Sequence, residues 1–516
     1  MLSRIRFTNL SISSKVLLIS VLLSGCSSLP EEFEHSPESK VAYSTSSLSE
    51  LRDGQKSGQT ESENSAVLLQ NSGWEALSQR LALIEMAEQS IDIQYYIWNS
   101  DDSGRYLASR IIEAANRGVK VRVMLDDINL DEREDLLTSL NAHSNIEIRI
   151  FNPIPTRKGV SKWLRVLGDF SRLNRRMHNK TFTVDGVVSV VGGRNIGDEY
   201  FDLSDEINFR DRDAMVMGEV VGEIQSSFIS YWDSRWSYPV ELLGGEQTLD
   251  LSDIDKIARP HYHGYPNLPE DNEAAYHFLQ ALMPQMTWVQ ASFISDQPVP
   301  EDADDTSIPK ETAVTLSQLV NQAKSSVTLE SAYLIFDDRQ LEGIKQQTNS
   351  GIEIKALTNS MVSNDLITNH SGYAGRRQDM LENGLQLFEL KPDTALCESS
   401  TRDASKCAPI TPYGLHTKSA VFDKKVAVIG SFNFNLRSTY LNTESLLIVE
   451  DLAIAEELAN DITQAMNEEN SWRLGLEEGD PRWYSGDKVW ETEPETGRWE
   501  RFNSRFLQLF PIEKYL

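Results

Sequence analysis

Basic residues are scarce in this sequence. Its 516 residues include 49 lysines and arginines against 78 aspartates and glutamates, which gives a formal net charge of −29. That balance argues against non-specific binding of nucleic acid and removes any general attraction to an anionic lipid surface. Attraction to a phosphate group must therefore come from a local arrangement of side chains.

Long apolar runs are scarce as well, and the run near the N-terminus, Val16 to Leu23, is too short to span a membrane. Basic residues precede it and Leu23-Ser24-Gly25-Cys26 ends it, which is the pattern of a bacterial lipoprotein signal. We predict that residues 1–25 are removed and that acyl chains on Cys26 anchor the mature protein to a bilayer. A plain secretory signal with an incidental cysteine is the alternative.

The segment that follows, residues 26–65, is rich in Ser, Glu, Gln, Gly and Lys and has few large apolar side chains. Such a composition does not offset the entropy of ordering the chain, so we expect a flexible tether. Ser27 after the cysteine resembles an outer-membrane sorting signal. We therefore expect a protein of the bacterial cell envelope, lipid-anchored on the periplasmic side, at the outer rather than the inner membrane.

Cysteine is rare, and besides Cys26 the chain has Cys397 and Cys407. An oxidising envelope compartment would allow these two to close a short loop, and two free thiols are the alternative. The acidic stretch from Asp126 to Asp135 lacks the glycine that an EF-hand calcium loop needs for its sharp turn. We interpret this stretch as a solvated loop, and we expect no metal site and no cofactor.

The most informative feature that is present is an internal repeat. Residues 87–96 recur in form as residues 323–332, and each copy is typical of a helix end that enters a strand. A helical stretch and a second strand follow in both copies, and Gly118 and Gly351 stand where helix C-caps are expected. Strand, helix, strand predicts a right-handed crossover unit, so we expect an α/β protein with two similar domains, each a mixed β-sheet flanked by helices.

The repeat sets the expected boundaries. We predict a first domain over 66–240, a linker or insertion over 241–310, a second domain over 311–465 and a C-terminal extension over 466–516. The expected helices span 103–117, 339–350 and 372–382, and the expected strands include 146–151 and 385–390. The extension contains four tryptophans and should cap the core, with membrane contact as the alternative.

One local basic segment lies in the first domain. Seven lysines and arginines between Arg157 and Arg176 are interleaved with apolar residues such as Trp163 and Phe170. This composition suits a membrane-facing surface. It suits an ordinary amphipathic helix with a solvated basic face equally well.

The strongest signal is a motif that occurs once in each half at identical spacing. The first half has His178-x-Lys180-x4-Asp185, and the second has His416-x-Lys418-x4-Asp423. Gly192-Gly193-Arg194-Asn195 and Gly430-Ser431-Phe432-Asn433 follow at the same offsets. Residues two apart in a strand face the same side, so each His and Lys pair projects from one face of its sheet. If the halves pack face to face, all four side chains converge.

Two imidazoles beside one phosphodiester suit a two-step reaction. One attacks phosphorus while the other, protonated, donates a proton to the departing alkoxide, and the roles swap in the second step. Lys180 and Lys418, together with Asn195 and Asn433, can donate to the non-bridging oxygens of the phosphate. No metal is required for this chemistry.

Each imidazole also needs an acid that fixes its tautomer. The candidates by position are Glu444, whose segment follows directly from the second motif, and Asp213 in Asp211-Arg212-Asp213. The motif aspartates Asp185 and Asp423 belong to the candidate site by sequence. However, Asp185-Gly186 is a hairpin-turn signal, so we favour a structural role for both aspartates over contact with substrate.

These motifs resemble those of the phospholipase D superfamily, whose paired motif is His-x-Lys-x4-Asp followed by Gly-Gly/Ser and Asn. The runs 169–186, 191–198 and 429–438 are similar to bacterial cardiolipin synthases of the C type. The resemblance implies two phospholipase D-type domains packed with pseudo-twofold symmetry, and transfer of a phosphatidyl group between phospholipids without a cofactor. It also implies that His178 is the nucleophile of a covalent phosphohistidine and that His416 is the acid and base.

The expected substrates are phospholipids, with phosphatidylglycerol first and phosphatidylethanolamine as a second candidate, and no nucleic-acid partner is expected. Hydrolysis of envelope phospholipids is an alternative, because water can replace the acceptor alcohol in the second step. A nuclease fits the acidic balance poorly. A lipid-binding envelope protein without turnover fits poorly with the intact sets of His, Lys and Asn.

Overall fold

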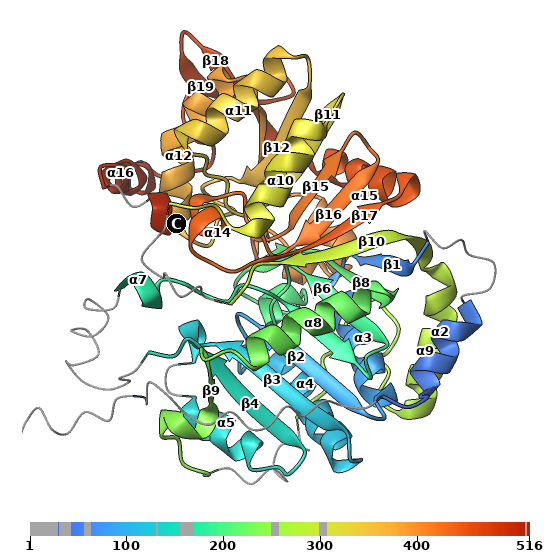
Figure 1. Ribbon diagram of the computed structural model, residues 1–516. Helices are drawn as coiled ribbons and strands as arrows, with labels where there is room; N and C mark the ends of the chain where they lie inside the picture. The colour runs from blue at the N-terminus through green and yellow to red at the C-terminus, as the bar shows by residue number, and fades with distance from the viewer. Residues whose placement is uncertain are drawn as a thin grey trace, which may run out of the picture.

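The computed structural model describes residues 29, 43–55, 63–130, 133–154, 170–248, 257–298, 307–510 and 513–516 (Figure 1). The predicted signal peptide and Cys26 lie outside these ranges, as does the part of the basic segment before Phe170. Within the described ranges, no helix is both long enough and apolar enough to cross a membrane.

Part of the predicted tether is ordered. Helix α2 (Ser47–Gln55) lies within it, Leu48 is buried in the core of the first domain, and Leu51 packs against that core. The expectation of a flexible tether is therefore wrong for this helix, because a few apolar side chains suffice when a preformed core is available to receive them.

The first domain is built on a mixed sheet. Its strand order is β1-β8-β6-β5-β2-β3-β4-β9, with β2, β3 and β4 parallel and the other pairs antiparallel. The strands are β1 (Ser65–Gln70), β2 (Ser90–Tyr95), β3 (Lys120–Asp126), β4 (Ile146–Phe151), β5 (Thr181–Val184), β6 (Val188–Gly192), β8 (Asp213–Gly218) and β9 (Ser237–Pro239).

The second domain repeats this topology. Its order β17-β16-β15-β11-β12-β13 matches β8-β6-β5-β2-β3-β4 strand for strand, including the parallel run β11-β12-β13. The strands are β11 (Ser326–Ser331), β12 (Glu353–Asn359), β13 (Gln386–Leu390), β15 (Lys418–Phe422), β16 (Val426–Gly430) and β17 (Ser445–Glu450). The prediction of two similar mixed α/β domains is confirmed.

Strand β10 (Thr287–Ser295) joins the two sheets. It pairs antiparallel with β1 through residues 287–289 and with β17 through residues 290–295, so the sheets run into one another edge to edge (Figure 1). We expected only a linker or insertion over residues 241–310. The strand was not predicted, although Val289, Ala291 and Phe293 alternate with more exposed residues as the period of a strand requires.

Helices cover both faces of each sheet (Figure 1). In the first domain α3 (Gly73–Met86) and α4 (Asp102–Asn116) pack on one face and α8 (Val220–Trp232) on the other. In the second domain α10 (Glu311–Gln322), α11 (Asp338–Asn349) and α12 (Ile367–Glu382) share one face, and α15 (Leu452–Ala465) packs on the other.

The predicted helix ends are confirmed at the two repeat glycines. Gly118 follows α4 with φ of +102° and Gly351 follows α11 with φ of +90°. A residue with a Cβ is strained in this left-handed region, which explains why glycine stands at both positions. Each helix then turns directly into the next parallel strand of its sheet.

The C-terminal extension caps the second domain, as predicted. Strand β18 (Ser471–Glu477) pairs with β13, and β19 (Asp480–Ser485) and β20 (Lys488–Trp490) extend that edge of the sheet. Trp472 and Trp483 are buried in the core that α10 and α11 cover. Helix α16 (Arg498–Leu507) then packs against α12, but its Trp499 is not part of any buried cluster and is 70% exposed.

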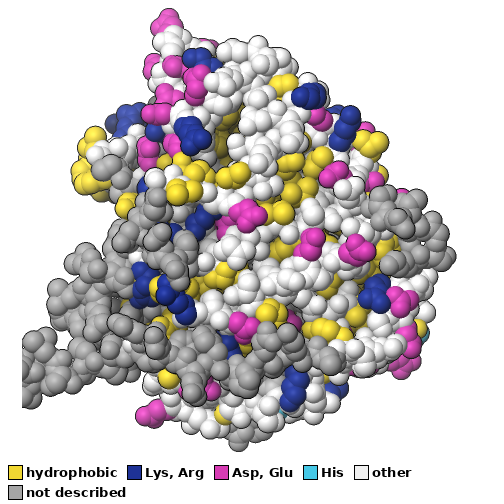
Figure 2. All heavy atoms as spheres, viewed as in Figure 1, with side chains coloured by type: hydrophobic (Ala, Val, Ile, Leu, Met, Phe, Trp, Pro, Cys, Tyr) yellow, Lys and Arg dark blue, Asp and Glu magenta, His cyan; other side chains and the backbone are white. Residues whose placement is uncertain are grey.

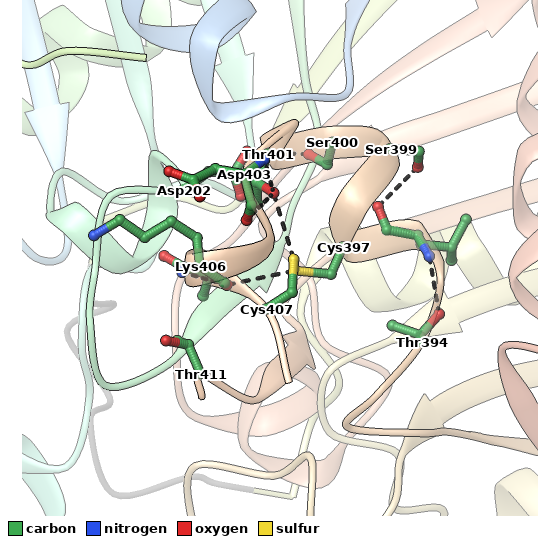
Figure 3. Close-up of a disulfide and its surroundings, with 12 residues drawn as sticks. Asp202, Thr394, Cys397, Ser399, Ser400, Thr401, Asp403, Lys406, Cys407 and Thr411 are labelled. Atoms are coloured by element: carbon green, nitrogen blue, oxygen red, sulfur yellow. Dashed lines mark hydrogen bonds between the residues drawn. A yellow bond between two sulfur atoms is a disulfide. The ribbon is translucent and has the colours of Figure 1, made fainter. Parts of the chain in front are cut away.

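Cys397 and Cys407 form a disulfide (Figure 3), which confirms the closed-loop prediction. The bridge closes a loop between helix α13 (Leu396–Thr401) and the segment that leads to strand β14 (Tyr413–Leu415). Lys406 in this loop donates hydrogen bonds to Leu203 O and Asp205 of the first domain. The bridged loop therefore connects the two domains just before His416.

Candidate active site

The backbone of each motif histidine is held by the other domain. The His178 N–H donates to Thr443 O at 2.9 Å, and the His416 N–H donates to Arg210 O at 2.8 Å. Strand β14, which leads into His416, pairs in parallel with β7 (Asn208–Arg210) of the first domain. Each motif histidine is therefore fixed in place by a backbone hydrogen bond to the other domain.

Each imidazole also receives its carboxylate from the opposite domain. His178 Nδ1 lies 2.8 Å from Glu444 Oε2 and 3.0 Å from the carbonyl oxygen of Ser431. His416 Nδ1 lies 2.5 Å from Asp211 Oδ2. Because these partners are hydrogen-bond acceptors, we assign the proton of each neutral ring to Nδ1, which leaves the lone pair on Nε2.

The Glu444 carboxylate is fixed on both of its oxygens. Ser431 Oγ donates to Oε2 at 2.5 Å and Ser438 Oγ donates to Oε1 at 2.6 Å. The backbone N–H of Glu444 donates to Asp296 Oδ2 at 2.9 Å. Burial alone would raise the pKa of Glu444, but the neighbouring His178 and Lys180 lower it below its ordinary value. The carboxylate is therefore ionised and rigidly placed against its histidine.

The prediction that Asp213 is the acid partner of the second histidine is wrong, because Asp211 has that position. Asp213 instead forms buried ion pairs with Arg80 at 2.8 Å and with Arg194 at 3.2 Å. Its carboxylate compensates two guanidinium groups in the core of the first domain, which is a structural role.

The register of the two sheets explains why Asp211, and not Asp213, contacts His416. The Gly193 N–H donates to Arg212 O, and the Ser431 N–H donates to Ser445 O. Arg212 and Ser445 therefore occupy equivalent positions in the two domains. The residues that precede them, Asp211 and Glu444, are equivalent as well. As with Glu444, burial would raise the pKa of Asp211, and the contact with His416 lowers it below its ordinary value.

The motif aspartates lie in the turns and not at the imidazoles. Asp185 has φ of +52° in the β5-β6 turn, and its carboxylate accepts backbone N–H groups of Glu88, Gln89 and Ser90. Asp423 has φ of +54° in the β15-β16 turn and accepts the backbone N–H groups of residues 324–326 in the same way. These contacts agree with the favoured structural interpretation, and we do not keep either residue in the proposed catalytic set.

The two lysines are buried beside their own histidines. Lys180 Nζ donates to His178 O at 2.6 Å, and Lys418 Nζ donates to His416 O. Burial lowers the pKa of Lys180 to about 7 and that of Lys418 to about 8, even though Glu444 and Asp211 oppose the shift for both. The charge of Lys418 lowers the pKa of Lys180 further, which places the two ammonium groups in one site.

The histidines share that site. Burial lowers the pKa of His178 to about 4, partly opposed by Glu444, and the charge of Lys418 from the other domain adds to the lowering. Burial and Lys418 lower the pKa of His416 to about 3, partly opposed by Asp211, and Lys180 from the first domain adds to it. Both rings are therefore neutral at pH 7.

The close approach of the two motifs requires a glycine at position 193, directly after β6. A Cβ on Gly193 would lie 2.7 Å from Asp211 Oδ1 and 3.2 Å from Cδ of Lys418. The carboxylate and the lysine of the opposite motif thus fill the space that a side chain would need. Ser431 stands at the matching position of the second motif and uses its hydroxyl to hold Glu444.

The asparagines of the two motifs are buried as well. Asn195 Oδ1 accepts the Ile97 N–H at 3.3 Å. Asn433 Oδ1 has no hydrogen-bond partner within the described part of the chain. Their predicted contacts with substrate oxygens stay a prediction.

Three aromatic rings that the sequence analysis did not single out surround the histidines. The Tyr96 ring lies edge-on to His178 with centroids 4.8 Å apart, and the Tyr200 ring lies edge-on to His416 at 5.0 Å. Phe209 lies 5.5 Å from His416. Tyr96 directly follows the carboxyl end of parallel strand β2, the position where sheets of this kind place ligand sites, and this was the one available signal.

The buried lysines lead to a prediction about stability. Replacing Lys180 by Met should raise the free energy of unfolding near pH 7 by an amount on the order of a few kcal/mol, because a desolvated cation is removed. The unfolded chain holds the lysine proton up to pH 10.5 and the folded chain only up to about 7, so folded wild type gains stability as pH rises between these values. The advantage of Lys180→Met should therefore shrink over that window.

Urea unfolding of wild type and Lys180→Met from pH 6 to 10 measures this difference. The exposed Lys424 of the β15-β16 turn, changed to Met, is the matched control and should show no such trend. A variant less stable than wild type at pH 7 would contradict the prediction.

Comparison with known proteins agrees with the two-domain arrangement. The family model described as cardiolipin synthase, PLD-like domain, matches residues 81–232 and 316–466, one match in each domain. Cardiolipin synthase C of Escherichia coli (strain K12) is 35% identical over 460 residues, covering 85% of this chain and 93% of that protein. An uncharacterised protein of Helicobacter pylori (strain J99) is 33% identical over 442 residues, covering 84% of each.

Among solved structures, the phosphatidylserine synthase of Haemophilus influenzae Rd KW20 superposes with a TM-score of 0.56 at 13% identity, covering 91% of this chain and 100% of that one. This likeness concerns the fold. The family match in both halves and the 35% identical relative show that the chain belongs to the phospholipase D superfamily, as a two-domain member of its cardiolipin synthase family.

Proposed function

We propose that this protein is a cardiolipin synthase, which transfers a phosphatidyl group between phospholipids through a covalent phosphohistidine. The observation that carries the proposal is the reciprocal exchange of carboxylates, in which Glu444 orients His178 and Asp211 orients His416 across the domain seam. Such an exchange supports one site with two imidazoles, which is what a double displacement at phosphorus requires.

In the first step His178 is the nucleophile. With Nδ1–H bound to Glu444, Nε2 attacks the phosphorus of a phosphatidylglycerol donor and forms an N–P bond while the bond from phosphorus to the glycerol oxygen breaks. The entering phosphodiester anion offsets the repulsion from the two lysines, so that His416 takes up a proton and passes it from Nε2 to the departing alkoxide. Asp211 stabilises the imidazolium meanwhile.

In the second step the roles reverse. His416, now neutral, takes the proton from a hydroxyl of the acceptor lipid, the oxygen of that hydroxyl attacks phosphorus, and the N–P bond to His178 breaks. Lys180 and Lys418 counter the negative charge on the non-bridging oxygens throughout. With a second phosphatidylglycerol as acceptor the product is cardiolipin, and with water it is phosphatidic acid.

The proposed place of action is the bilayer to which the protein is attached. The lipoprotein signal supports an acylated Cys26 and a periplasmic active site at the envelope. Such a location gives direct access to phosphatidylglycerol, and to phosphatidylethanolamine as a second donor.

Mass spectrometry of lipid products tests the proposal. Purified full-length protein is incubated with vesicles of phosphatidylglycerol, with and without phosphatidylethanolamine, and cardiolipin is the expected product. Phosphatidic acid without cardiolipin would favour the hydrolase alternative. Absence of both products under conditions where the protein is folded would overturn the proposed function.

A further inference from the structure

Helix α16 presents an aromatic face to the outside. Trp499, Phe502 and Phe506 lie on one side of the helix at helical spacing and are 70%, 56% and 50% exposed, and Leu509 beyond the helix end is 77% exposed. The rings of Trp499 and Phe502 stack at 5.5 Å, and the row continues through Phe506 to Phe510. Figure 2 shows this hydrophobic group at the left edge of the molecule, at the place of α16 in Figure 1.

The opposite side of α16 is firmly attached. Ser504 is buried, and Gln508 lies against Gly375 of α12. Just before the helix, Glu493 pairs with His370 and Arg377 of α12 at 2.9 Å each. Burial would raise the pKa of Glu493, but His370 and Arg377 lower it to about 2, so its carboxylate stays ionised against Arg377 over the physiological range. The outward direction of the rings is therefore fixed by the fold.

The charges on α16 suit an anionic partner. Arg498, Arg501 and Arg505 stand on the helix against one acidic residue, Glu500, in a chain whose net charge is −29. Large aromatic rings beside arginines are the composition of helices that lie in the interface of a bilayer. The local excess of positive charge on this helix is attracted to anionic lipid headgroups, whereas the net charge of the whole chain is not.

Helix α12 connects the place of α16 with a segment near the active site. Helix α12, which carries α16, begins with the exposed Leu366 and Ile367. The residue before them, Asp365, accepts the Tyr333 hydroxyl at 2.8 Å, and burial raises the pKa of this carboxyl although Tyr333 and Lys418 oppose the shift. A Cβ on Gly414, two residues before His416, would lie 2.6 Å from Ser363 O, so the segment that leads into the exposed end of α12 lies near the active site.

The chain end after α16 returns to the same rim. Tyr515 O accepts a hydrogen bond from Arg437 at 3.1 Å, and Arg437 also donates to Asn174, four residues before His178. Figure 1 shows α16, the C-terminus and α7 (Phe170–Leu173) on the same side of the molecule.

From this juxtaposition of an outward aromatic row, flanking arginines and the site rim, we infer that α16 docks on an anionic phospholipid bilayer with its rings in the boundary between headgroups and acyl chains. Docking there presents the active-site rim to the lipid surface, independently of any anchor at the N-terminus. The choice of a bilayer over a protein partner rests on the proposed phospholipid substrate.

Binding is tested without catalysis. An environment-sensitive fluorophore is attached to the full chain at Phe502→Cys, and at Leu452→Cys as control, since Leu452 is 60% exposed and begins α15, a helix on the opposite side of the molecule from α16 (Figure 1). The unsubstituted chain carried through the same labelling gives the background. Vesicles containing phosphatidylglycerol should shift the emission at position 502 to the blue and leave position 452 unchanged, with a smaller shift on neutral vesicles.

No shift at position 502, or equal shifts at both positions, overturns the inference. A shift that depends on protein concentration in the absence of vesicles also overturns it, because the face would then be covered by a second copy of the chain.

Catalysis provides the second measurement. The variant Trp499→Ser, Phe502→Ser, Phe506→Ser is compared with Leu452→Ser on long-chain phosphatidylglycerol in vesicles and on a short-chain phosphatidylglycerol dispersed below its micelle concentration. The ratio of vesicle rate to dispersed rate should fall by about tenfold or more for the triple variant, since interfacial binding scales with the apolar area inserted. It should not change for Leu452→Ser.

An unchanged ratio in the triple variant overturns docking through α16 while leaving the proposed function intact. If wild type is inactive on both substrates, the proposed function fails, and the fluorescence experiment still decides whether α16 binds the bilayer.

Discussion

The His178→Ala variant is expected to lose turnover by a factor on the order of 10⁴ or more and to form no covalent intermediate, as removal of a nucleophile does in other double-displacement enzymes. His416→Ala should lose turnover to a similar extent but for a different reason. It retains the nucleophile with its Glu444 contact, and lacks only the group that protonates the leaving alkoxide and later activates the acceptor.

A donor with a good leaving group separates the two cases. The p-nitrophenyl ester of phosphatidic acid releases an oxyanion that needs no protonation, so His416→Ala should give a burst of about one p-nitrophenolate per protein and then stop. With a radiolabelled phosphatidyl group the same variant should become labelled, through an N–P bond that is cleaved by acid and is stable to base. His178→Ala should show neither burst nor label.

Near-UV circular dichroism of both variants checks that the site still assembles, because the two aromatic neighbours Tyr96 and Tyr200 pack against these imidazoles. Label on His178→Ala and none on His416→Ala would assign the nucleophile to the second domain. Label on neither, in folded protein, would contradict a phosphohistidine mechanism altogether.

Much of the fold was predictable because the chain carries the same local pattern twice. Helix α11 and strand β4 lie within one residue of their predicted bounds, and the glycines that end the helices before β3 and β12 have the expected left-handed conformation. Here the local preferences and the tertiary structure agree. Helix α12 begins five residues before its predicted start at residue 372, since no N-cap side chain marks its first turn.

The elements that were not predicted depend on partners far away in sequence. Strand β10 is stable because it pairs with β1 and β17, and helix α2 because Leu48 enters a core formed by other segments. Neither lies in the segments whose sequences repeat, although β10 pairs with β17 as β1 pairs with β8, so no second copy of the sequence pointed to either. Non-local pairing of this kind leaves only a weak trace in the local pattern.

The residues of the candidate site divide in the same way, into those tied to the repeated motifs and those placed by pairing with distant segments. The histidines, the lysines and Glu444 could be assigned because their spacing is tied to the motifs, and the structure brings them together. Asp211 follows Gly192 by 19 residues, whereas Glu444 follows Gly430 by 14, because the segment from Asn195 to Arg210 is longer than the matching segment from Asn433 to Thr443. Spacing alone could not choose between Asp211 and Asp213, and hydrogen-bond register was needed.

The second large effect is expected at the two orienting acids. Glu444→Gln and Asp211→Asn should each lower kcat by a factor on the order of 10⁴, the size found when the aspartate of a catalytic triad is changed to asparagine. An amide in place of the carboxylate can donate to Nδ1 of the histidine, which moves the ring proton to Nε2 and removes the lone pair that must attack phosphorus or accept a proton. Binding of substrate should change much less, so the loss is expected in kcat more than in KM.

Asp213→Asn is the matched control, because it is the same chemical change two residues away from Asp211. Its carboxylate pairs with Arg80 and Arg194 in the core, so the variant should lose about 3–5 kcal/mol of unfolding free energy, the cost of leaving buried charge without a partner. The kcat per folded molecule should stay close to that of wild type. Denaturant unfolding and single-turnover kinetics on the same three variants thus separate the two positioning acids from the structural one. The contrary result is that Asp213→Asn loses turnover at unchanged stability while Asp211→Asn keeps it. The position of the proton on His416 would then be set by a group other than Asp211, which contacts the ring.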